Sequence, residues 1–118
     1  MNLARCDVVI QVWPFASGVG RKMRPALVVQ NDLDNRRLAN TIVVMITSRV
    51  SRANEPSQLM IDISTPEGKQ TGLRQNSVIN CVNLFTIDQT RILHVIGSLP
   101  TALILKVDDC LKTALGLP

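Results

Sequence analysis

The chain has 118 residues, of which 46% are hydrophobic and 19% charged, and its formal net charge is +4. This composition is typical of one folded domain spanning residues 1–118, and it excludes a disordered tail or a low-complexity linker. No apolar run approaches the roughly 20 residues that cross a bilayer, and residues 1–7 lack the apolar core of a secretion signal, so we expect a cytoplasmic protein with no membrane partner.

The first half of the chain is predicted to form β-strands. Asp7–Trp13 places Val8, Ile10 and Val12 on one face and is closed by a proline. A basic loop with two glycines follows, and then a second strand over Pro25–Gln30. Thr41–Thr47 has little polar alternation, which is typical of a central, buried strand.

The second half is predicted to continue the sheet. Ser57–Ile63 and Ser77–Leu84 are expected strands, and a short sixth strand is expected around His94–Ile96. Polar or turn-rich segments separate the strands. These segments are Asn31–Asn40, which has room for a helical turn, Arg49–Pro56 and Ser64–Gly72.

Only the end of the chain is predicted to form a longer helix. Ser98 is the expected N-cap, Pro100 lies in the first turn, and apolar residues recur every four positions before Gly116. Those residues are Leu103, Val107, Leu111 and Leu115. Short strands with one terminal helix predict a mainly β fold, a small barrel-like antiparallel sheet with the helix packed on it.

The cysteines and the distribution of charge limit the kinds of site and partner that the chain can have. Cys6, Cys81 and Cys110 are odd in number, far apart and set among apolar residues, so we expect reduced core thiols and neither a metal site nor a cofactor. Through Asn54 the chain carries eight Lys or Arg against three Asp, and from Glu55 onward five against six acids. A polyanionic partner would therefore meet the first half.

Short motifs along nearly the whole chain resemble the MazF/PemK family of toxin endoribonucleases. The motifs are RPALVVQND at Arg24–Asp32, ITS at Ile46–Ser48, SVI at Ser77–Ile79 and TID at Thr86–Asp88, in family order. The resemblance implies an SH3-like barrel of the CcdB/PemK type with a C-terminal helix, a homodimer, and metal-independent, sequence-specific cleavage of single-stranded RNA. It also implies silencing by a MazE-like antitoxin whose acidic, flexible tail lies over the RNA groove.

Arg24 and Thr47 match the family's catalytic pair. Metal-free cleavage lets the ribose 2′-OH attack its own phosphate, so the protein must handle two protons and stabilise charge on phosphorus. The guanidinium of Arg24 can bind two phosphate oxygens, and the Thr47 hydroxyl can donate to the phosphate or accept from the 2′-OH. Ser48 is the alternative if the strand register differs by one. The single histidine, His94, is interpreted as structural because its neighbours are apolar.

Further residues are candidates for RNA contacts. Basic loop residues can hold phosphates, amide side chains can read a base, and an aromatic ring can stack on one. These candidates are Arg21, Lys22, Arg49, Arg52, Gln30, Asn31 and Phe15.

Two alternatives remain open at this point. The first is a gyrase poison of the CcdB type, which has the same fold but relies on a Trp-Gly-Ile ending, whereas this chain ends Gly-Leu-Pro. The second is an inactive barrel that binds RNA or an antitoxin. The chain also departs from the family pattern at Cys6, where Gly is common, and at Val82, Asn83 and Phe85, which affects the expected cleavage motif and pairing surface.

Overall fold

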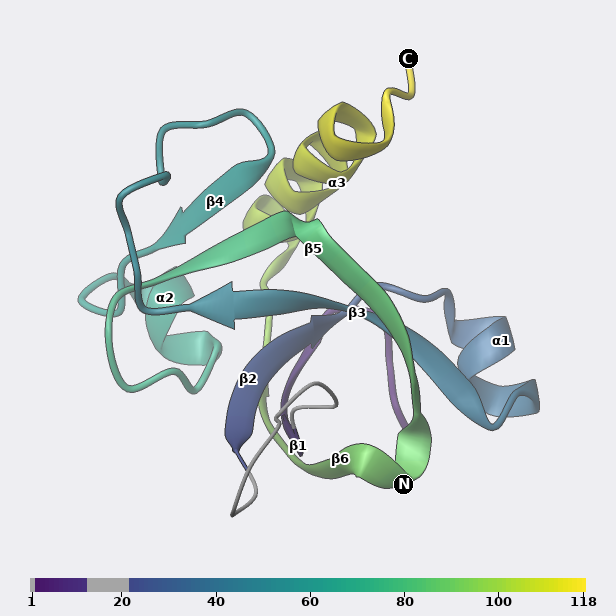
Figure 1. The fold of residues 1–118 in the computed structure, drawn as a ribbon. Helices are drawn as coiled ribbons and strands as arrows, with labels where there is room; N and C mark the ends of the chain where they lie inside the picture. Colours follow the sequence, from purple (N-terminus) through teal and green to yellow (C-terminus); the bar gives the residue numbers. More distant parts are fainter. Residues whose placement is uncertain (1, 13–21) are drawn as a thin grey trace.

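The computed structural model describes residues 2–12 and 22–118. Its described strands form one antiparallel sheet in the order β4-β5-β3-β2-β1-β6 (Figure 1). The strands are β1 (Asp7–Val12), β2 (Met23–Val28), β3 (Asn40–Thr47), β4 (Gln58–Ile61), β5 (Ser77–Asp88) and β6 (Ile92–Ser98).

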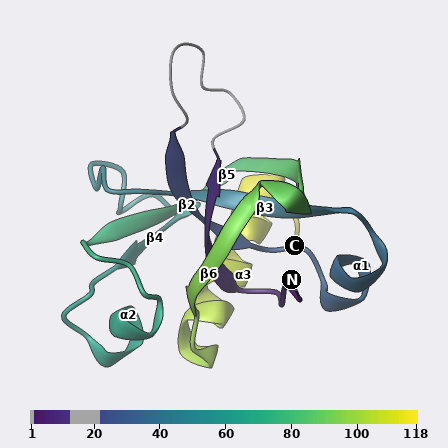
Figure 2. The same cartoon turned by 90° about the horizontal axis from the view of Figure 1, so that it is seen from below.

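Helices lie at the ends of the sheet and behind it. The α-helices are α1 (Asp32–Arg37), α2 (Pro66–Gln70) and α3 (Thr101–Leu115), and a 3-10 turn, η1 (Gln89–Arg91), joins β5 to β6. Figures 1 and 2 show α1 and α2 at opposite ends of the sheet, while α3 packs on β4 and β5.

The predicted mainly β architecture with a C-terminal helix is confirmed. The prediction that Thr41–Thr47 is central is also confirmed, because β3 pairs with both β2 and β5. Within the described residues the two edge strands, β4 and β6, do not pair with each other, so the ladders do not close a barrel.

A bulge bends β5. Val44 of β3 lies opposite Leu84, but the next residue, Met45, lies opposite Asn80. The three residues between these partners, 81–83, therefore have no partner in β3. A bulge increases the local bend of a strand, and Figure 1 shows β5 turning sharply between its two halves.

The strongly curved sheet has an apolar cluster on each face. One cluster lies beneath α3 and includes Val8, Leu27 and Val107. The other includes Val9, Val28 and Met45, with Phe85 packed against it. Alternate residues of a strand point to opposite faces, which explains how the neighbours Val8 and Val9 join different clusters.

The thiols are buried as predicted. Cys6, Cys81 and Cys110 are all free and at most 6% exposed. The Cys81 and Cys110 thiols are in hydrogen-bonding contact, and burial raises the pKa of Cys81 to about 12. These groups contribute to packing and stay protonated at neutral pH.

Two details of the helices differ from the prediction. Helix α3 begins at Thr101 with Pro100 as N-cap, so Ser98 is the last residue of β6 and caps no helix. The segment Ser64–Gly72 holds α2, whose N-cap Thr65 accepts from the amide of Gly68. Gly116 ends α3 in the left-handed conformation, as its position predicts.

Among the described residues, no helix is long and apolar enough to cross a membrane.

Candidate functional site

A groove of about 1130 Å³ lies where β2, β3, β5 and β6 meet two loops. Its described lining carries arginines and amide or hydroxyl side chains but no Asp or Glu. The four arginines are Arg24, Arg49, Arg52 and Arg74. Such a lining has a positive potential and many hydrogen-bond donors, which suits a polyanion.

Arg24 and Thr47 lie at the same end of two neighbouring strands. The paired register of β2 and β3 ends at Ala26 and Met45, and Arg24 and Thr47 each lie two residues beyond that pair, at the same end of the sheet. Because two residues along a strand return to the same face, both side chains lie on the face of Ala26 and Met45. Both line the groove.

The end of β3 fixes the hydroxyl of Thr47. Its Oγ1 accepts from the backbone amide of Arg49 at 3.1 Å, which leaves the hydroxyl hydrogen free to donate. Ser48, the alternative to Thr47, is exposed and also lines the groove. Ser48 lies one residue beyond the end of β3.

Arg24 is exposed and has a buried neighbour in β1. Gln11 lies opposite Arg24 in the β1–β2 ladder and is 0% exposed. The Gln11 amide nitrogen contacts Met45 Sδ at 3.3 Å, and its Oε1 has no hydrogen-bond partner in the described part of the chain. The residue opposite Arg24 in the ladder thus carries a buried amide oxygen that no described residue satisfies.

The loop that follows β3 brings two predicted RNA-contact residues to the groove. Arg49 and Arg52 both line it and are exposed. The Nε of Arg52 lies 3.6 Å from Glu55 Oε2, an exposed pair that holds the side chain weakly. Both guanidinium groups are therefore accessible to phosphates.

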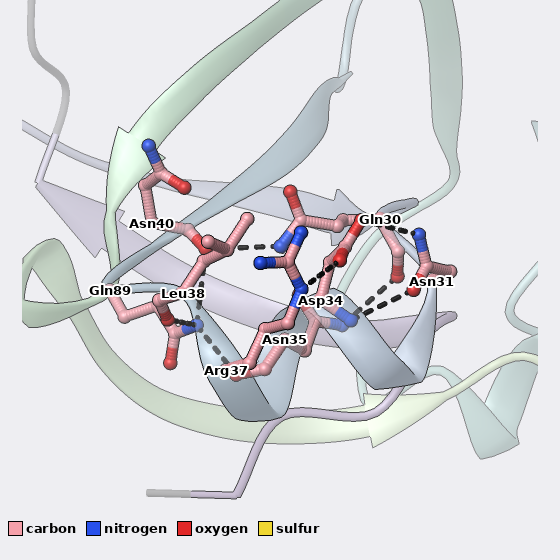
Figure 3. A network of polar contacts seen from close by, with 8 residues as sticks. All are labelled: Gln30, Asn31, Asp34, Asn35, Arg37, Leu38, Asn40 and Gln89. Carbon is pink, nitrogen blue, oxygen red and sulfur yellow. Dashed lines mark hydrogen bonds and ion pairs between the residues drawn. The ribbon is translucent and has the colours of Figure 1, made fainter.

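Gln30 and Asn31 do not line the groove. Gln30 is 6% exposed, and its amide nitrogen donates to Asn35 Oδ1 and to the carbonyl of Asn40 (Figure 3). Asn31 caps α1 by accepting from the amide of Asp34 at 2.8 Å. The Gln30 amide links α1 to the start of β3 and the Asn31 amide caps α1, so both side chains take part in local structure.

The remaining predicted contacts are in or beside the first loop. Lys22 is described and exposed, but it is not part of the groove lining. Arg21 and Phe15 lie outside the described residues.

Several groove residues were not predicted from the sequence. Arg74 and Gln75 arrive from the loop between α2 and β5, and Gln58, Asn80 and Asn83 from β4 and β5. No local motif marks them, because they come together only when the chain folds.

His94 also lines the groove. It is exposed on β6 opposite Ile10, so the apolar neighbours that suggested a structural role do not bury it. Strand alternation places His94 and Ile10 on the opposite face of the sheet from Gln11 and Arg24.

The described residues contain no cluster of three or more His, Cys, Asp or Glu side chains able to hold a metal ion. The chemistry available in the groove is that of guanidinium, hydroxyl, amide and imidazole groups.

Residues 4–115 match the family model described as the PemK-like, MazF-like toxin of type II toxin-antitoxin systems. Endoribonuclease EndoA of Bacillus subtilis is 36% identical over 95 residues, which cover 80% of this chain and 78% of that protein. Endoribonuclease MazF6 of Mycobacterium tuberculosis is 34% identical over 119 aligned positions, which cover 99% of this chain and 100% of that protein.

Solved structures agree with the fold. A mycobacterial endoribonuclease in complex with its cognate antitoxin has a TM-score of 0.75 and 26% identity, covering 98% of this chain and 97% of its own. The MazE-MazF structure from Deinococcus radiodurans has a TM-score of 0.77 at 18% identity and covers 100% of both chains, a likeness of fold alone.

Proposed function

This chain belongs to the PemK-like, MazF-like family of type II toxins, and from that premise we propose that it is a metal-independent endoribonuclease that cuts single-stranded RNA at short sequence motifs. The observation that carries the proposal is that Arg24 and Thr47, at the same end of β2 and β3, both line a groove whose described lining has four arginines and no acidic residue.

The proposed reaction uses the ribose 2′-OH as nucleophile. The 2′-oxygen attacks the adjacent phosphorus and loses its proton, and the bond to the 5′-oxygen breaks as that oxygen gains a proton. The products are a 2′,3′-cyclic phosphate and a 5′-OH end. Negative charge builds on the non-bridging oxygens in the transition state, so preorganised donors there lower the barrier.

Arg24 supplies the main electrostatic contribution. Its planar guanidinium can donate two hydrogen bonds to the phosphate oxygens, and its permanent charge opposes the charge that develops there. Thr47 donates to a phosphate oxygen or accepts from the 2′-OH, because its Oγ1 keeps both a hydrogen and a second lone pair. The two residues approach the same phosphate from neighbouring strands.

Arg49 and Arg52 hold the flanking phosphates in this proposal. Both lie in the loop after β3, next to Thr47, so an RNA strand placed on the catalytic pair continues past them. Phosphate contacts of this kind position the strand and give affinity without reading the sequence.

We further propose that the toxin acts in the cytoplasm as a homodimer and is silenced by a MazE-like antitoxin. Relatives of this fold have been solved with their antitoxins bound. The described lining of the groove contains no acidic residue, which supports an acidic, flexible antitoxin tail as its occupant in the silenced state.

The test is cleavage of a long unstructured RNA in the presence of EDTA. Wild-type protein should give discrete cuts with 2′,3′-cyclic phosphate or 3′-phosphate ends and 5′-OH ends. Arg24→Ala and Thr47→Ala should each reduce the cleavage rate by about 10²-fold or more, since removing one transition-state donor costs roughly that much.

Thermal unfolding and RNA binding of both variants serve as controls for folding. No cleavage of diverse RNAs by folded wild-type protein would contradict the proposal. A DNA supercoiling assay with gyrase would then separate a CcdB-type poison from an inactive binding barrel.

A further inference from the structure

Two amide side chains in the groove are joined to each other beside the catalytic pair. Gln58 and Asn80 lie opposite each other in the β4–β5 ladder, and both line the groove. Gln58 is 7% exposed, and its Nε2 donates to Asn80 Oδ1 at 2.8 Å. Neither side chain belongs to the proposed catalytic machinery.

The orientation of Asn80 is fixed by a backbone donor. Its Oδ1 also accepts from the amide of Val82 at 3.1 Å, at the start of the β5 bulge. A backbone N–H can only donate, so it must meet the oxygen of the Asn80 amide and not its nitrogen. Both lone pairs of Oδ1 are thereby used, and the orientation of Gln58 follows from its donation to the same oxygen.

Within the described part of the chain, Asn80 and Gln58 leave one donor and one acceptor without a partner. Asn80 Nδ2 and Gln58 Oε1 make no hydrogen bond among the described residues, and neither is a buried unpaired atom. The donor, Asn80 Nδ2, and the acceptor, Gln58 Oε1, are held side by side in fixed orientations. This arrangement matches the edge of an RNA base, which offers one acceptor beside one donor.

Asn80 also lies close to the proposed catalytic residue Thr47. Thr47 lies opposite Val78, and Asn80 is two residues further along β5, on the same face. Diagonal neighbours of this kind are roughly 7–8 Å apart. A base next to the phosphate held at Thr47 could therefore reach Asn80 without a change in the sheet.

We propose that Asn80 and Gln58 form a base-reading pair that selects one unpaired base of the RNA next to the cleaved phosphate. The inference rests on the proposed endoribonuclease function and names a specificity determinant within it. Arg24 and Thr47 act on the phosphate, which every nucleotide shares, whereas Asn80 and Gln58 act on the base.

The test is to sequence the cut ends of a random single-stranded RNA library. Asn80→Ala should lower the preference for one base at one motif position about tenfold, which is the effect expected from losing one base contact. Asn80→Asp keeps an oxygen for Val82 but replaces the groove donor by an acceptor. It should move the preference at that position toward guanine, because two acceptors side by side match the adjacent N1–H and N2–H donors of guanine.

Asn54→Asp is the matched control, because it adds the same charge at an exposed loop residue that does not line the groove. It should leave the motif unchanged. If wild-type protein cuts and the folded Asn80 variants retain its full motif, this inference fails while the proposed function stands. If wild-type protein cuts nothing, both fail.

A second measurement does not depend on the variants folding. Wild-type protein labelled with ¹⁵N is titrated with a motif RNA that carries 2′-deoxyribose at the cut site and so cannot react. The side-chain amide signal of Asn80 should shift with this RNA and not with one whose base at the read position is replaced. Equal shifts with both RNAs would overturn the proposal.

Discussion

Cys6 has a backbone conformation that residues with a Cβ rarely adopt. Its φ is 72°, in the left-handed region, where a side chain costs about 1 kcal/mol relative to glycine. The conformation is held by two backbone bonds, one from Cys6 to Val28 and one from Leu99 to Cys6. This explains in physical terms why the family pattern commonly has glycine where this chain has cysteine.

Substitutions at Cys6 should separate backbone strain from packing. Cys6→Ala keeps the strain and loses the buried sulfur, whereas Cys6→Gly loses both, so we expect the glycine variant to be more stable than the alanine variant by about 1 kcal/mol. Urea unfolding measures the difference. At Cys110, inside α3, the order should be reversed, because glycine is about 1 kcal/mol worse than alanine in a helix. The same order at both positions would contradict this explanation.

The groove residues differ in how far sequence could identify them. Arg24 and Thr47 stand in short motifs, so the family resemblance pointed to them directly. Gln58 and Asn80 are 22 residues apart and become neighbours only through the β4–β5 register. Gln30 has the same side chain as Gln58 but lies outside the groove, where its amide donates to Asn35 and Asn40, and no local pattern reveals this difference.

At the scale of elements, the strands were more predictable than the short helices. Alternating or continuous apolar residues mark β1 and β3, because each strand face meets a core. Helix α2 has only five residues, too few for a helical period to show, and depends on its Thr65 cap. The length of β5 was underestimated because its bulge interrupts the alternation.

The turn after β5 should make stability depend on acidic pH. The carboxylate of Asp88 accepts from the amide and hydroxyl of Thr90, both at 2.9 Å, and these bonds lower its pKa below 3.8. The folded-state pKa is below the unfolded one, so the stabilisation is complete above about pH 4 and is lost as the pH falls through the folded-state pKa.

Asp88→Asn keeps an acceptor oxygen but removes the titration. Between pH 6 and pH 2.5 the urea midpoint should therefore fall less in this variant than in the wild type. Asp109→Asn is the control, because the Asp109 carboxylate accepts no hydrogen bond in the described structure. Parallel curves for Asp88→Asn and wild type would show that the Thr90 contacts add no pH dependence.

Gly97 lets β6 approach the segment that carries part of the groove. A Cβ at Gly97 would overlap the backbone carbonyl of Thr71, at the end of α2. The loop after Thr71 brings Arg74 and Gln75 to the groove. We therefore expect Gly97→Ala to lower the free energy of unfolding by about 2 kcal/mol and to weaken RNA cleavage.

Gly116→Ala is a useful comparison for Gly97→Ala. No atom of the described residues lies within 4 Å of the position of a Cβ at Gly116, so that variant suffers only from its left-handed φ of 69°. It should lose about 1 kcal/mol and keep full cleavage. Calorimetry and a cleavage assay test both variants. If Gly97→Ala has the stability and the cleavage activity of the wild type, α2 can move away from β6 without loss of free energy of unfolding.

At the scale of the whole molecule, folding concentrates positive charge that the sequence only partly localises. The first 54 residues carry eight basic and three acidic residues, which predicted where a polyanion would bind. The structure gathers Arg24, Arg49 and Arg52 from that half and adds Arg74 from the other. Arg74 was not predictable, because its place depends on the contact of α2 with β6.

This gathering of charge should appear in the salt dependence of RNA binding. Each phosphate contact to a single strand contributes about −0.7 to the slope of log K against log salt concentration. Arg74→Ala should therefore reduce the slope by about 0.7, measured by anisotropy with an RNA that carries 2′-deoxyribose at the cut site. Arg91→Ala removes the same charge from an exposed residue outside the groove and should leave the slope nearly unchanged. Equal losses of slope in both variants would mean that the RNA responds to net charge and does not follow the groove past Arg74.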